Sequence, residues 1–103
     1  MEVKVNNEFI LSNSARSDIL ALWEYIAESA GKRTADRFRK KIFKALDFLA
    51  EMPHAGHRRE DLTLLDVKFW TVGDYAIIYD PLSVPLYVVR VMHWSRDLSY
   101  LLH

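Results

Sequence analysis

The sequence has no cysteine, and it has only three glycines and three prolines among 103 residues. The absence of cysteine excludes disulfides, thiolate nucleophiles and thiolate metal sites, and it is compatible with a reducing compartment. So little glycine and proline gives no sign of a disordered tail or a repeat array. Half of the residues are hydrophobic, so we expect a single domain over residues 1–103 with one core.

Signals for a membrane or for export are also lacking. No apolar run is long enough to cross a bilayer. The first eight residues, MEVKVNNE, mix apolar, basic and acidic side chains, which does not suit a secretory signal. These features predict a cytoplasmic protein with no membrane partner.

Neither sign of charge is in excess, because 14 basic side chains balance 14 acidic ones. Proteins that bind nucleic-acid backbones broadly usually carry a basic excess, so we do not expect a general nucleic-acid binder, and a local basic site stays open. There is no glycine-rich phosphate loop and no serine in a nucleophile elbow, so no cofactor is expected. His54 and His57 alone are too few ligands for zinc, so no metal site is expected.

The first half of the chain has the pattern of a short strand followed by a helix. Phe9–Leu11 is a short apolar run, and Ser12 or Ser14 could cap a helix that starts near Asn13. This helix should end near Ser29, before Gly31. Its apolar side chains recur at helical spacing, at Ile19, Leu22, Trp23, Ile26 and Ala30.

A second helix is predicted after the turn Gly31–Arg33, with Thr34 as its N-cap and Pro53 closing it. The short connection favours an antiparallel helical hairpin. The apolar stripe of this helix comprises Ala35, Phe38, Ile42, Ala45, Leu46 and Leu49. Its basic residues lie mostly off the stripe and are interpreted as a solvated surface: Arg37, Lys40, Lys41 and Lys44.

Three strand-like runs follow a polar loop at residues 54–61, and they cover Val67–Val72, Tyr75–Tyr79 and Leu86–Met92. The dipeptides Gly73-Asp74 and Asp80-Pro81 between them are typical of turns, so an antiparallel meander is expected. The predicted fold is therefore α+β, in the order β-α-α-β-β-β, with the helical hairpin packed on one face of a small, mostly antiparallel sheet.

Four segments of the sequence together resemble one known family. They are Ser12-x-x-Ala15-x-x-Asp18-Ile19-x-x-Leu22-Trp23-x-Tyr25-Ile26-Ala27, Pro53-x-x-Gly56-x-x-Arg59-x-Asp61-Leu62, Phe69-Trp70-x-Val72-x-x-Tyr75-x-Ile77-x-Tyr79 and Arg90-Val91-Met92-His93-x-x-Arg96-Asp97-Leu98. In this order they resemble the ParE/RelE toxin superfamily, and most closely the ParE-like toxins, or plasmid stabilization system proteins. Trp94 departs from the pattern, because the family commonly has a small residue there.

The resemblance implies the RelE/ParE-like fold and a cognate antitoxin whose C-terminal segment wraps the toxin. It also implies a bacterial type II toxin–antitoxin system. ParE proteins are regarded as inhibitors of DNA gyrase, whereas RelE proteins are ribosome-dependent mRNA endonucleases, and the shared fold cannot choose between them. The closer match to ParE and the neutral charge favour gyrase inhibition without catalysis. An mRNA interferase and an inactive binding module stay open as alternatives, as does a dimer or a heterotetramer with the antitoxin.

If the chain were a nuclease, its acid, base and cation would be sought among Arg90, His93, Arg96 and Tyr100. Strand alternation places Leu86, Val88, Arg90 and Met92 on one face and Tyr87, Val89, Val91 and His93 on the other. Arg90 and His93 would then point apart unless the strand bulges. We therefore favour a structural role for both, such as hydrogen bonding at the sheet edge.

Contacts with a target or antitoxin are expected at the loop arginines and near the C-terminus. The candidate residues are Arg58, Arg59, Arg90, His93, Arg96, Asp97, Leu98 and Leu102. Arg58 or Arg59 could instead pair with Glu60 or Asp61. Asp97 is expected mainly to anchor the tail, by capping a turn or by pairing with Arg59 or Arg90.

The aromatic side chains are assigned mostly to the core, and those assigned there are Trp23, Tyr25, Phe38 and Phe69. Tyr25 is expected to be half exposed, with its hydroxyl in water. Three apolar side chains that the core does not need could line a groove for the antitoxin, namely Phe43, Phe48 and Leu102.

Overall fold

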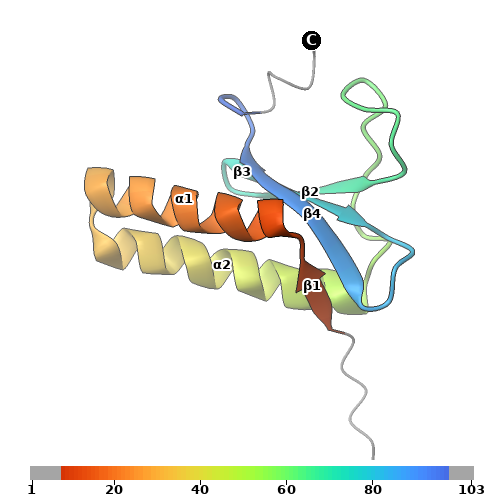
Figure 1. Cartoon of the computed structure of the whole chain (residues 1–103), viewed down its shortest axis with the longest axis horizontal. Helices are drawn as coiled ribbons and strands as arrows, with labels where there is room; N and C mark the ends of the chain where they lie inside the picture. Colours follow the sequence, from red (N-terminus) through yellow and green to blue (C-terminus); the bar gives the residue numbers. More distant parts are fainter. Residues whose placement is uncertain (1–7, 98–103) are drawn as a thin grey trace, which may run out of the picture.

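A computed structural model describes residues 8–97, and its elements follow in the order that the sequence predicts (Figure 1). They are β1 (Phe9–Leu11), α1 (Asn13–Ala30), α2 (Lys32–Glu51), β2 (Lys68–Val72), β3 (Tyr75–Asp80) and β4 (Leu86–His93). Ser12 is the N-cap of α1, as expected, and its hydroxyl accepts a hydrogen bond from the amide of Ala15. No helix among the described residues is long and apolar enough to cross a membrane.

The turn between the two helices is tighter than the sequence predicted. Gly31 alone separates α1 from α2 and has φ 95°, a conformation that side chains other than glycine rarely adopt. Its amide donates to Ala27 O, and its carbonyl accepts from the amide of Ala35. The assignment of Thr34 as N-cap was therefore wrong. Ala30 is exposed rather than buried, because this end of the hairpin projects beyond the sheet (Figure 1).

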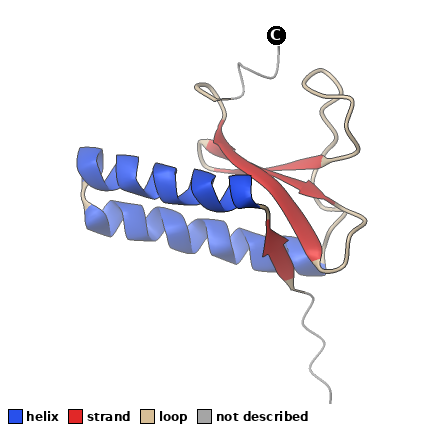
Figure 2. Cartoon of the chain, in the orientation of Figure 1, coloured by secondary structure: helices blue, strands red, loops and turns tan. Residues whose placement is uncertain are grey.

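The four strands form one sheet in the order β1-β4-β3-β2 (Figure 2). Strands β2, β3 and β4 are the expected antiparallel meander. Strand β1 pairs in parallel with β4, from Phe9 opposite Leu86 to Leu11 opposite Val88. Strand β4 is therefore an internal strand along its first three residues only, which leaves the rest of its edge for another element.

Each face of the sheet has its own apolar cluster. The helices cover one face, where Ile42 and Leu46 of α2 pack with Ile77 and Val88 of the sheet. The other face carries a second cluster, which the sequence did not predict, formed by Leu62, Val67, Phe69, Ala76, Ile78 and Met92. Leu62 and Val67 come from the segment between α2 and β2, so this segment is packed against the sheet and is not only a polar loop.

A buried tyrosine fixes the start of that segment. Tyr79 is 0% exposed; its hydroxyl donates to Pro53 O over 2.7 Å and accepts from the amide of Gly56 over 2.9 Å. Burial raises the pKa of Tyr79 above its ordinary value. These two hydrogen bonds hold the chain that follows α2 against β3.

Strand β4 contains an irregularity that overturns the predicted alternation. Val88 pairs with Tyr79, but Arg90 pairs with Ile78, so Val89 is an extra residue. One inserted residue reverses the side-chain alternation, so each residue of β4 after Val89 faces the opposite side of the sheet from the side predicted. Val91 consequently belongs to the helix-side cluster and Met92 to the opposite one. The predicted assignment of Val91 and Met92 to the two faces was therefore wrong.

Candidate functional site

The free edge of β4 is covered by the first turns of α1. The amide of Ser12 donates to Val88 O over 3.0 Å, and its hydroxyl donates to Val89 O over 2.7 Å. Strand β1 pairs with β4 up to Leu11, and the next residue, Ser12, caps α1. Helix α1 therefore starts beside β4. Ser12 thereby satisfies two carbonyl groups of β4, at the last residue that pairs with β1 and at the residue after it.

Asp18 continues this cover and holds Arg90. Its carboxylate accepts from Arg90 Nε over 2.7 Å, from Arg90 Nη2 over 2.8 Å and from the amide of Val91 over 3.0 Å. The Asp18 side chain is only 15% exposed, whereas that of Arg90 is 40% exposed. The hydrogen bond with Asp18 raises the pKa of Arg90. Arg90 is thus held as part of a charged pair that joins α1 to β4.

Replacing Asp18 by alanine should destabilise the fold by about 2 kcal/mol, because it leaves Arg90 and the Val91 amide without their shared acceptor. The loss should not be larger, since the guanidinium is partly in water. Asp18→Asn, which keeps an acceptor, should lose about half as much. Urea unfolding measures both, with the exposed Asp47→Ala as control, expected within about 0.5 kcal/mol of the parent. Equal stability of Asp18→Ala and Asp47→Ala would contradict the role given to Asp18.

The groove beside this pair gathers several of the predicted residues. It has a volume of about 540 Å³ and is lined by Asp18, Ala21, Leu22, Tyr25, Arg90, Val91, Met92, Arg96 and Asp97. The Arg96 guanidinium lies 4.9 Å from the centre of the Tyr25 ring, and Arg96 Nε is 3.3 Å from Asp97 Oδ1. Tyr25 is 55% exposed, as expected. The structure therefore brings Arg90, Arg96 and Asp97 to one surface.

His93 lies apart from that groove. Its Nδ1 accepts from the amide of Arg96 over 3.1 Å and lies 3.2 Å from Ser95 Oγ, and its ring meets the edge of Tyr75 with centroids 5.4 Å apart. Asp97 closes the same turn, because its carboxylate accepts from the His93 amide over 2.9 Å. Asp97 thus caps a turn, one of the predicted alternatives, and makes no direct ion pair with Arg59 or Arg90.

The two loop arginines lie on the other side of the sheet. Arg58 pairs with Asp66 and Glu60, and Arg59 forms two hydrogen bonds to Asp61. The Arg59 guanidinium also lies 5.2 Å from the centre of the Trp94 ring, and Trp94 in turn stacks on Phe69. The unusual Trp94 thus closes the second apolar cluster. Leu98, Tyr100 and Leu102 lie outside the described residues.

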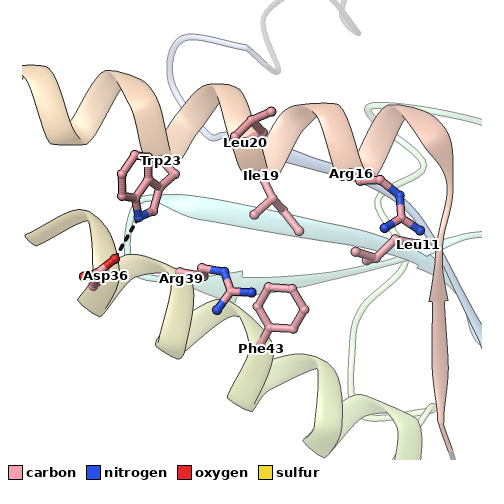
Figure 3. A pocket seen from close by; sticks show the side chains of 8 residues that line it. All are labelled: Leu11, Arg16, Ile19, Leu20, Trp23, Asp36, Arg39 and Phe43. Atoms are coloured by element: carbon pink, nitrogen blue, oxygen red, sulfur yellow. Dashed lines mark hydrogen bonds between the residues drawn. The ribbon is translucent and has the colours of Figure 1, made fainter. Parts of the chain in front are cut away.

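A second groove runs between α1 and α2 and has mainly apolar walls (Figure 3). Leu20 lies off the buried stripe of α1 and is 59% exposed at this groove. Trp23 Nε1 donates to Asp36 Oδ1 over 3.0 Å across the groove, and the Arg39 guanidinium lies 4.8 Å from the centre of the Phe43 ring. Its volume is about 540 Å³, and its lining residues are Leu11, Arg16, Ile19, Leu20, Trp23, Asp36, Arg39 and Phe43.

The residues that line this groove differ in part from those that the sequence predicted. Phe43 lines it, but Phe48 packs against Trp70 instead, with ring centroids 5.3 Å apart. Trp23 was assigned to the core, yet it is only partly buried and forms a wall of the groove. Sequence reasoning also missed Leu20; its one signal was a large apolar side chain outside the periodic stripe. Within residues 8–97, no three His, Asp or Glu side chains come together as metal ligands.

The matches to known proteins cover most of the chain. One of the solved structures that match is described as the chromosomal ParDE toxin–antitoxin system from P. aeruginosa; it has a TM-score of 0.72 and 13% sequence identity, and the match covers 85% of this chain and 96% of that one. At that identity the likeness shows the fold. No curated protein matches the sequence. The family model of the ParE toxin of the type II toxin–antitoxin system parDE matches residues 9–98. The chain therefore belongs to the ParE toxin family of type II toxin–antitoxin systems.

Proposed function

We propose that this ParE-type toxin inhibits DNA gyrase and is neutralised by a cognate antitoxin that binds in the groove between α1 and α2. The observation that carries the proposal is the family match over residues 9–98. The solved structure with the same fold is itself described as a toxin–antitoxin system. Both features fit a small protein that acts by binding another macromolecule.

The chemistry of the α1–α2 groove supports it as the antitoxin site. Leu20 and Phe43 offer apolar surface, while Arg16 and Arg39 place positive charge beside it (Figure 3). A groove of this kind suits an amphipathic helix that combines apolar anchors with carboxylates at its margin. We therefore expect an antitoxin segment with acidic residues flanking an apolar stripe.

The surface at the end of β4 supports target binding better than RNA cleavage. Cleavage needs an acid and a base placed around the scissile bond. Arg90 is engaged by Asp18, and His93 Nδ1 is engaged by the turn that follows the strand. His93 does not line the groove that Arg90 and Arg96 share. This arrangement favours a gyrase-facing surface formed by Arg90, Arg96 and Asp97 over an mRNA interferase.

Induced expression of the chain in a bacterial host should arrest growth, and co-expression of the cognate antitoxin should restore it. Growth curves measure both effects, with mRNA integrity in a translation extract as the second readout. We expect intact messenger in the extract. Unimpaired growth at a high level of folded protein would favour the inactive binding module, and cleaved messenger would favour the RelE-like nuclease.

A further inference from the structure

The charges of this neutral chain are separated in space, and helix α2 holds most of the positive ones. It carries seven of the chain's 14 Lys and Arg but only three of its 14 Asp and Glu. All seven cations lie within Lys32–Lys44, where Asp36 is the one carboxylate. The balanced total, which argued against a nucleic-acid binder, thus conceals a strongly basic segment.

Four of these cations form a continuous row on the solvent side of α2. Arg33, Arg37, Lys40 and Lys44 follow the spacing i, i+4, i+7 and i+11, which places them on one helical face. The buried stripe with Phe38 and Ile42 occupies the opposite face. All four side chains are exposed. At about 1.5 Å per residue, the row extends for roughly 16 Å along the helix. We call these four residues the basic row.

The fold itself makes no use of the basic row. Every ion pair found within residues 8–97 involves an arginine outside α2. Asp36 bonds to Trp23, and Asp74 lines the same hollow as Arg37 without forming an ion pair with it. Like charges at i and i+4, such as Arg33 with Arg37 and Lys40 with Lys44, oppose helix stability by about 0.2–0.5 kcal/mol per pair. The basic row therefore slightly lowers the stability of the isolated chain.

The surroundings of the row point to phosphate as its ligand. The helical hairpin projects beyond the sheet at its Gly31 end, so this part of α2 is open to a large partner (Figure 1). Phe43 is partly exposed but lines the α1–α2 groove, and none of the large exposed apolar side chains lies between residues 32 and 44. A protein partner on the face of the row would need such an anchor. Nor does the row contain an exposed aromatic ring, on which single-stranded bases would stack.

We propose that the basic row of α2 binds the phosphate backbone of double-stranded DNA. Arginine and lysine in a row, without apolar or aromatic neighbours, are typical of contacts that hold a duplex without reading its sequence. The affinity should be weak at physiological salt, because the rest of the chain carries the compensating negative charge. The row lies on a different face of α2 from Arg39, which lines the α1–α2 groove, so this site is separate from the one proposed for the antitoxin.

The test measures binding of the full chain to a labelled duplex of about 20 base pairs by fluorescence anisotropy, between about 50 mM and about 200 mM salt. With four phosphate contacts, log K against log salt should have a slope of about −3 to −4. The variant Arg37→Gln/Lys40→Gln should bind at least about tenfold more weakly at the lowest salt, with a slope reduced by about 2. Arg58→Gln/Arg59→Gln removes the same charge on the other side of the sheet, outside both grooves, and should bind within about threefold of the parent.

Thermal unfolding separates loss of binding from loss of structure. The row variant should be at least as stable as the parent, because it relieves repulsion between like charges. The proposal is overturned by no binding at the lowest salt, or by equal losses in the row variant and the control. It is also overturned if poly-glutamate binds the row as tightly as the duplex does, since that result identifies an acidic protein as the partner.

Discussion

Leu20→Glu should weaken antitoxin binding about 100-fold or more while leaving the protein folded. Leu20 is 59% exposed at the α1–α2 groove and belongs to no buried cluster, so the fold does not depend on it. Truncating a central apolar contact of an interface typically costs about 2 kcal/mol or more. A carboxylate at this position would also repel the acidic partner that Arg16 and Arg39 are expected to attract.

Leu64→Glu is the matched control, because Leu64 is 89% exposed in the segment before β2 and does not line the groove. Titration of each purified variant with the antitoxin gives the affinities. In cells, the Leu20 variant should still arrest growth, but the antitoxin should no longer relieve the arrest. If Leu20→Glu binds the antitoxin as tightly as the parent does, the antitoxin site lies elsewhere.

Gly56→Ala should reduce the free energy of unfolding by about 3 kcal/mol or more. A Cβ atom at this position would lie 2.5 Å from Tyr79 Oη and 2.8 Å from Phe69 O. The carbonyl cannot move aside easily, because Phe69 and His57 exchange two backbone hydrogen bonds. The substitution therefore combines overpacking, which costs about 1–3 kcal/mol, with the loss of a buried hydrogen bond, which costs a similar amount.

Gly73→Ala provides the comparison for this prediction. Gly73 has φ 58° but no atom within 4 Å of an added Cβ, so its replacement should cost only about 1 kcal/mol of backbone strain. Thermal unfolding should show a decrease in Tm of at least about 12 °C for the Gly56 variant and of about 4–8 °C for the Gly73 variant. Equal decreases would mean that the close approach at Gly56 is not what requires glycine there.

The helices and the meander could be predicted because the spacing of apolar residues along the sequence indicates each element directly. Ile42, Leu46 and Leu49 recur at helical spacing, and all are buried against the sheet. The start of α2 could not be placed, because a single glycine with positive φ can reverse the chain, and Thr34 looks locally like a good cap. The extra residue in β4 was also hidden, since Val88 and Val89 are alike and either could face the core.

Much of the candidate site depends on contacts between distant parts of the sequence. Asp18 and Arg90 are 72 positions apart, and neither local sequence indicates that the two residues form an ion pair. The family resemblance marks Gly56 and Tyr79, but only the structure gives the reason, a hydrogen bond across 23 positions. Leu20 illustrates the opposite case, because periodicity shows that it is off the core stripe but not which neighbour makes a groove around it.

Under the proposed function, this chain is expected to act by binding DNA gyrase, and an antitoxin is expected to prevent that binding. The most direct measurement is the supercoiling of relaxed plasmid by purified gyrase during titration with the folded toxin. We predict that supercoiling is lost as toxin is added and returns when the cognate antitoxin is supplied. Full supercoiling at saturating toxin would contradict the account.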